Sequence, residues 1–74
     1  MKITYDPEVD AAYIQLREAE PARAVDVAEG VTADLDAEGN LIGFEVLDAS
    51  ERIGEQGLES LSFELLTSRL PKSA

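Results

Sequence analysis

The acidic side chains between Asp34 and Glu45 have the types and most of the spacing of a calcium-binding loop. An EF-hand loop places oxygen ligands at positions 1, 3 and 5, a glycine at position 6 and a bidentate glutamate at position 12. Counted from Asp34, those positions hold Asp34, Asp36, Glu38, Gly39 and Glu45. Glu38 departs from the pattern, because it is one methylene longer than the Asp or Asn expected there. By the types and spacing of its side chains, the segment suggests a divalent-cation site.

The residues that flank this loop predict strands, whereas an EF-hand requires a helix on each side. Apolar and polar residues alternate in both flanks, 31–35 and 41–47, which is the period-two pattern of half-buried strands. Between them, Gly39 and Asn40 tolerate the positive φ that a hairpin turn requires. In such a hairpin, Glu45 lies on a strand away from the turn and cannot close an ion cage. We therefore interpret the segment as an acidic β-hairpin.

A second acidic cluster, formed by Asp6, Glu8 and Asp10, surrounds Pro7. Paired carboxylates can bind metals or perform acid–base chemistry. Aspartates beside a proline turn more often accept hydrogen bonds from backbone N–H groups. We expect Asp6 and Asp10 to have that structural role.

Six further residues have side chains that could serve recognition, capping or ion pairing. Tyr5 is expected in the core, and Tyr13, on the face opposite Ile14, is expected to be partly exposed. Asp48 or Ser50 is expected to cap a turn or helix after the last strand. Arg23 and Arg52 are expected to pair with neighbouring carboxylates, each worth at most about 1 kcal/mol if exposed.

The composition excludes several classes of active site. The 74 residues include no histidine and no cysteine, so Ser/His and Cys/His nucleophiles, thiolate metal sites and disulfides are impossible. Ser50 accordingly lacks a base that would make it a nucleophile. We predict that the protein is not an enzyme, and we assign no catalytic, cofactor-binding or metal-ligating residue and no cofactor.

The chain has a net charge of −10, from 16 acidic and 6 basic residues, and this charge indicates which classes of partner it could bind. Such a surface repels nucleic-acid phosphates, so direct DNA or RNA binding is not expected. The acidity serves solubility, or it complements a basic partner through long-range steering. No apolar run approaches the roughly 18 residues of a membrane span, and we expect no membrane association and a cytoplasmic protein.

Residues 1–74 are expected to form a single domain. Alternation predicts five strands, over 2–5, 12–17, 22–27, 31–35 and 41–47. Between 58 and 70, Leu58, Leu61, Leu65 and Leu66 follow a helical stripe that Pro71 would end, whereas Leu61, Phe63 and Leu65 also fit a short strand. The predicted fold is α+β: a small antiparallel β-meander of about five strands with one C-terminal helical element packed on one face.

Two ordered blocks of this sequence, the first over Lys2–Leu16 and the second over Gly30–Asp36 and Gly39–Ser50, resemble the YuzE-like family of small bacterial proteins of unknown function. The first contains Tyr5-Asp6-Pro7-Glu8 and Tyr13-Ile14-Gln15-Leu16, and the last contains Gly43-Phe44-Glu45-Val46-Leu47-Asp48-Ala49-Ser50. The chain departs from the family pattern at Phe44, where isoleucine is usual, and at Val9 and Ala11. The resemblance implies an antiparallel sheet with a small helical element. It brings no established activity or catalytic residue, and its link to small toxin-like genes suggests an antitoxin-type role.

Two functional classes follow from these observations. The first is a small acidic, non-enzymatic interaction protein, with the antitoxin-like partner of a basic protein as one specific role. The alternative is a divalent-cation or small-ligand binding domain that uses the acidic turns. A small core and unpaired sheet edges also favour self-association, most simply as a two-fold dimer.

Overall fold

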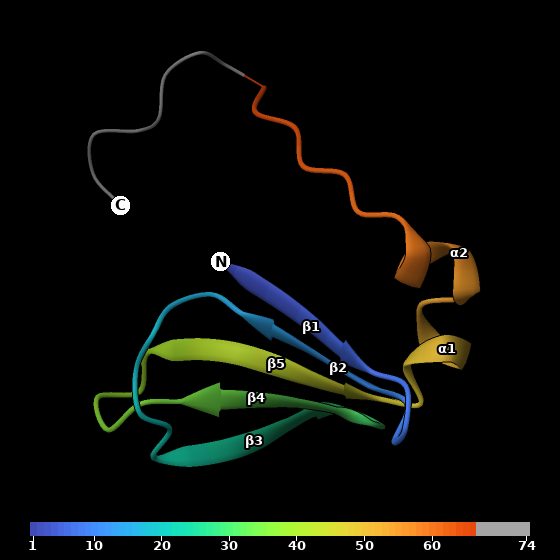
Figure 1. Cartoon of the computed structure of the whole chain (residues 1–74). Coiled ribbons are helices and arrows are strands. Elements are labelled where there is room, and N and C mark those ends of the chain that lie inside the picture. The colour runs from blue at the N-terminus through green and yellow to red at the C-terminus, as the bar shows by residue number, and fades with distance from the viewer. Residues whose placement is uncertain (67–74) are drawn as a thin grey trace.

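The computed structural model describes residues 1–66, in which five antiparallel strands form one open sheet (Figure 1). Two short helices follow the last strand. The strands are β1 (Lys2–Asp6), β2 (Ala11–Gln15), β3 (Arg23–Ala28), β4 (Val31–Leu35) and β5 (Leu41–Leu47), and the helices are α1 (Ala49–Arg52) and α2 (Glu55–Glu59). All five strands were predicted from alternation, two of them with the observed bounds.

The order of the strands across the sheet is β1-β2-β5-β4-β3. The meander follows the chain through β3, β4 and β5, and the β1–β2 hairpin joins it by pairing β2 with β5. The connection from β2 to β3 therefore passes the ends of β5 and β4. It is held there by backbone bonds, because the N–H of Leu16 donates to Ile42 (2.8 Å) and that of Ala22 to Leu35 (2.8 Å).

The register divides the sheet into two chemically different faces, because residues paired across strands point to the same side. One face, called the apolar face here, carries two successive rows of cross-strand partners. The first row is Ile3, Ile14, Phe44, Ala33 and Val25, and the second is Tyr5, Ala12, Val46, Val31 and Ala28. The other, called the polar face, carries Lys2, Thr4, Tyr13, Gln15, Asp26, Thr32, Asp34 and Glu45.

The hydrophobic core lies at one end of the apolar face. Ala49 of α1 is fully buried against Ala12 and Val46, and Leu58 of α2 and Val31 pack against this cluster. The other buried hydrophobic residues described are Ala33 and Ile42, and only Ile42 is a large side chain under 2% exposed. The helices thus cover the middle of the second apolar row, at Ala12, Val46 and Val31, while Ile3 and Val25 at the two ends of the first row are each 43% exposed.

The prediction of a helix starting at Leu58 is wrong for the described residues. Leu58 belongs to the short α2, which ends at Glu59, and the backbone of Ser60 is already extended (φ −138°, ψ 129°). Residues 60–66 form neither helix nor strand, and Figure 1 shows them leaving α2 past the β1 side of the sheet. The two serines at 60 and 62 favour helix weakly, and nothing packs firmly on the apolar stripe to compensate. Residues 67–70 of the predicted element lie outside the described residues.

A contact across three strands stabilises the polar face. The side chain of Tyr13 on β2 passes over Gly43 on β5, and its hydroxyl donates to Oδ2 of Asp34 on β4 at 2.8 Å. A Cβ at position 43 would collide with the carbonyl oxygen of Ile14 and lie 2.9 Å from the Tyr13 hydroxyl oxygen. Gly43 is therefore required because a neighbouring strand and a ring lie close to it.

We expect Gly43→Ala to lower the free energy of unfolding by about 2 kcal/mol, the usual size of an overpacking cost. Gly39→Ala is the matched control: it adds the same methyl in open space and costs only the left-handed backbone, about 1 kcal/mol. Urea titration followed by circular dichroism measures both. Equal losses for the two variants would contradict the proposed close contact.

Candidate interaction surface

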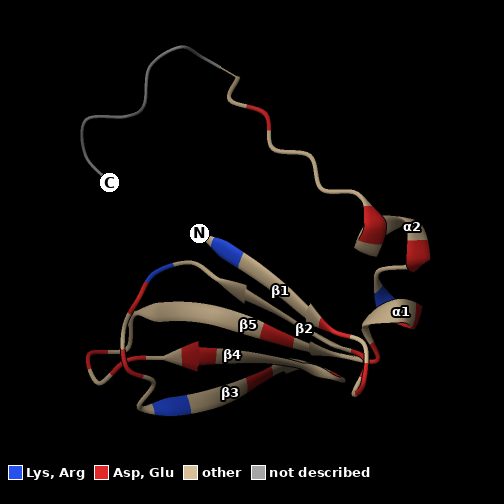
Figure 2. Cartoon of the chain, viewed as in Figure 1, with Lys and Arg blue, Asp and Glu red and all other residues tan. Residues whose placement is uncertain are grey.

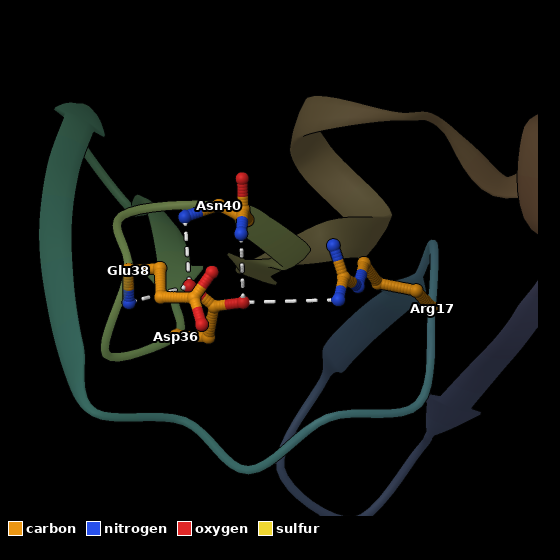
Figure 3. A network of polar contacts seen from close by, with 4 residues as sticks. All are labelled: Arg17, Asp36, Glu38 and Asn40. Atoms are coloured by element: carbon orange, nitrogen blue, oxygen red, sulfur yellow. Dashed lines mark hydrogen bonds and ion pairs between the residues drawn. The ribbon is translucent and has the colours of Figure 1, made fainter. Parts of the chain in front are cut away.

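The carboxylate of Asp36 organises the turn between β4 and β5 (Figure 3). It accepts hydrogen bonds from the backbone N–H groups of Glu38 (2.9 Å) and Asn40 (2.8 Å), and from the Asn40 side-chain amide (3.2 Å). Arg17 lies 3.8 Å away as an ion-pair partner. The backbone bond from Asn40 is the main cause that lowers the pKa of Asp36 below its ordinary value. The oxygens of this carboxylate are thus already occupied by groups of the protein.

The other positions of the calcium-loop pattern do not converge on the turn. Asp34 lies on β4, where it accepts the Tyr13 hydrogen bond, and Glu45 lies on β5 opposite Thr32. The predicted hairpin is confirmed by the pairing of β4 with β5. Within residues 1–66, no three acidic side chains are placed so that they could hold a metal ion.

Asp10, in the turn between β1 and β2, connects the sheet to α1. Its Oδ1 accepts the backbone N–H of Ser50 (3.0 Å) and the hydroxyl of Tyr5 (2.7 Å), and its Oδ2 accepts the hydroxyl of Ser50 (2.6 Å). Its backbone carbonyl also accepts the N–H of Ala49 at 3.0 Å. Asp10 therefore satisfies N–H groups at the start of α1, which is the role of an N-cap residue performed by a distant side chain.

The hydrogen bonds to Asp10 shift the pKa of its own carboxyl group and that of the Tyr5 phenol. The hydrogen bond from the Ser50 hydroxyl, followed by the bond from Tyr5, holds the pKa of Asp10 below its ordinary value of 3.8. The same bond to Asp10 is the main cause that raises the pKa of the Tyr5 phenol above 10.0. Both shifts favour the pair of a phenol donor and a charged carboxylate acceptor.

Several predicted roles are confirmed by these contacts and others are corrected. Asp6 accepts the N–H of Glu8 at 2.9 Å, as predicted for a proline turn. Asp10 bonds α1 and Tyr5 instead of its own turn. Tyr5 lies on the apolar face but is 38% exposed, so its placement in the core was wrong, because β1 is an edge strand of the sheet. Tyr13 is partly exposed on the polar face, as predicted.

The residues after the last strand also differ from expectation. Asp48 occupies the N-cap position of α1 in a left-handed conformation (φ 51°) but makes no side-chain capping bond. The Ser50 hydroxyl instead donates to Asp10. Arg52 donates from Nε to the carbonyl of Leu47 (3.0 Å), and neither it nor Arg23 forms an ion pair with a described residue. The carbonyl of Leu47 at the end of β5 therefore takes the place of the carboxylate partner expected for Arg52.

The polar face concentrates acidic groups on one half of the sheet, from β5 through β4 to the edge strand β3. Asp26 on β3 and Glu45 on β5 lie in one row on either side of Thr32, and Asp34 lies in the next row on β4. Figure 2 shows these acidic positions on three adjacent strands, whereas the basic positions on the strands lie near the starts of β1 and β3. Burial, then the Asp34 hydrogen bond and the charges of Asp34 and Glu45, raise the pKa of Tyr13. This face can attract cationic groups, and Tyr13 and Thr32 add hydroxyls among the carboxylates.

The sequence did not reveal the contact between Asp10 and Ser50. The two residues are 40 positions apart, and no local pattern predicts that distance to close. From the sequence, the acidic residues of the polar face could be identified only as residues of predicted strands that point away from the core. Their grouping depends on the strand order, which pairs β5 with both β2 and β4.

Asp10→Asn is expected to destabilise the protein at neutral pH and to weaken its acid dependence. Because the folded pKa of Asp10 is below its unfolded value, its contribution is fully present above about pH 4 and is lost as the pH falls through the folded pKa. Thermal melting between pH 2 and 7 measures this. Asp36 retains its own contribution in the variant, so some acid dependence should remain. An unchanged pH profile would contradict the role of Asp10.

Comparison with known proteins places these features in a family. A model described as "Protein of unknown function (DUF2283)" matches residues 2–50, which include all five strands and the start of α1. No curated protein and no solved structure matches the chain significantly. The matched region contains both Asp10 and Ser50 and the whole polar face.

Proposed function

This chain belongs to the DUF2283 family, and we propose that it is a non-enzymatic interaction protein that binds a basic protein partner through its polar face. Asp26, Asp34 and Glu45 carry the proposal, because three neighbouring strands present them together. Their carboxylates lie on a rigid sheet, so a partner meets them without ordering a loop first.

The distribution of charge supports a cationic partner. The chain has a net charge of −10, which steers basic proteins toward it and raises association rates at low salt. The acids of the two turns, Asp10 and Asp36, are already engaged in hydrogen bonds. On the polar face, Asp34 accepts one hydrogen bond, from Tyr13, and Asp26 accepts a long one from Thr32 (3.5 Å), so each keeps a carboxylate oxygen for lysine or arginine.

The narrower role proposed is that of an antitoxin-like partner in a bacterial cytoplasm, as the YuzE-like resemblance suggests. An antitoxin of this kind would act by covering a basic surface of its partner. No helix among the described residues is long and apolar enough to cross a membrane. The compartment remains a prediction from the sequence.

Affinity capture from a lysate of the source organism, followed by mass spectrometry, tests the proposal. We expect the wild-type chain to retain a basic protein at low salt and the variant Asp26→Asn/Asp34→Asn/Glu45→Gln to lose it. The matched control, Glu18→Gln/Glu20→Gln/Glu38→Gln, removes the same charge from loops and should retain the protein. Equal retention by both triple variants would contradict binding through the polar face.

A divalent-cation site in the acidic turns is the alternative function, and the contacts of these turns do not favour it. Millimolar calcium or magnesium, the weakest range of natural calcium sites, should leave the melting temperature of the chain unchanged and release no heat in calorimetry. A saturable rise in melting temperature that Asp36→Asn abolishes would instead support the alternative. Asp26→Asn serves as the control, because it removes the same charge from the polar face.

A further inference from the structure

We propose that residues 61–65 close onto the free edge of β1 as a sixth antiparallel strand and so form a strap over the groove beside it. β1 is an edge strand, because it is the first in the order of the sheet, and an edge strand leaves a row of backbone N–H and C=O groups without partners. Residues 60–66 make no backbone hydrogen bond to another described residue. The edge and the segment therefore each have backbone groups that the other can bind.

The groove already joins the segment to the edge strand. It has a volume of about 370 Å³, and its lining includes Ile3 and Tyr5 of β1 together with Leu61. A neighbouring cavity is lined by Met1, Ile3, Leu61, Ser62 and Phe63. Figure 1 shows the chain turning at α2, so that the residues after it run in the direction opposite to β1, as an antiparallel pair requires. Because the segment is tethered through α2, the pairing is intramolecular and has a high effective concentration.

The alternation of the segment matches the two faces of the sheet. Leu61, Phe63 and Leu65 alternate with Ser62 and Glu64. The odd-numbered residues of β1 lie on the apolar face, and cross-strand partners point to the same side. Pairing odd-numbered residues with one another thus extends both apolar rows by the three apolar side chains, which are 74%, 78% and 52% exposed in the structure. A shift of one residue would turn them to the polar face.

Charge selects one register among those that keep this alternation. Phe63 then lies opposite Ile3, and the pairs on the polar face are Glu64 with Lys2 and Ser62 with Thr4. Opposite charges and pairs of hydroxyl side chains both stabilise strands when they lie directly opposite each other. Lys2 forms no ion pair with a described residue, so Glu64 supplies the partner that it lacks. A shift of two residues in either direction separates these two charges.

Closure of the strap protects the edge of the sheet. An exposed edge strand is a template on which another chain can add a strand, and the strap occupies that template with a segment of the same chain. It also removes the apolar side chains of the groove from water without bringing a second acidic chain near. The acidic residues of the polar face on β3, β4 and β5 are not touched, so this proposal is independent of the proposed function.

Amide hydrogen exchange of the full chain, followed residue by residue by NMR, tests the closure. We expect alternate amides within 61–65 to exchange at least about tenfold more slowly than in an unstructured peptide, with a nuclear Overhauser contact between Phe63 and Ile3. Phe63→Ser should remove that protection, because it deletes the largest apolar group of the strap. Leu66→Ser is the matched control: Leu66 is 85% exposed against 78% for Phe63 and lies outside the strap, so protection should stay within about twofold.

A charge exchange tests the register and does not depend on the folding of Phe63→Ser. At about 50 mM salt, Glu64→Lys should lower the protection of the strap by about two- to fivefold, and Lys2→Glu/Glu64→Lys should restore it. Glu38→Lys makes the same charge change in the β4–β5 turn and should have no effect. Unprotected amides throughout 61–65 would overturn the closure, as would equal loss in Leu66→Ser. Protection that rises with chain concentration would also overturn it, because the strand would then come from another copy.

Discussion

The hydrogen bonds accepted by Asp10 are the contacts on which the arrangement of this protein depends, because they join the first turn of the sheet to the start of α1. The carboxylate receives the backbone N–H and hydroxyl of Ser50, while Tyr5 donates to it from β1. These bonds place Ala49 against Ala12 and Val46, which is the only cluster of buried residues described. A helix of four residues has little stability of its own. Its position therefore comes from this cap and from the burial of one alanine.

The small size of that cluster explains why much of the apolar face is not covered by the helices. A domain of this length buries only about 60% of its unfolded surface, and α1 and α2 reach only one end of the apolar face. Ile3 and Val25, at the two ends of the first apolar row, consequently stay 43% exposed. The polar face needs no cover, because carboxylates and hydroxyls are hydrated there.

The central strand β5 connects these two surfaces. It pairs with β2 on one side and β4 on the other, so it presents Phe44 and Val46 to the apolar face and Glu45 to the polar face. Gly43 lets the Tyr13 ring cross the strand and bond Asp34. A change at this glycine would consequently disturb the pairing and the polar face together.

Alternation was sufficient to predict the strands, the hairpin near Asp36 and the outward placement of Tyr13, because a strand's period of two is a local property. The absence of histidine and cysteine likewise excluded whole classes of site directly from the composition. Only the tertiary structure decided that β2 lies beside β5, that Asp10 caps α1, and that Tyr5 stays exposed. Those features depend on residues far apart in the chain. The prediction of a helix from Leu58 onward was wrong for the same reason. A periodic apolar pattern forms a helix only where a surface exists for it to cover, and in the described chain that surface ends with Leu58.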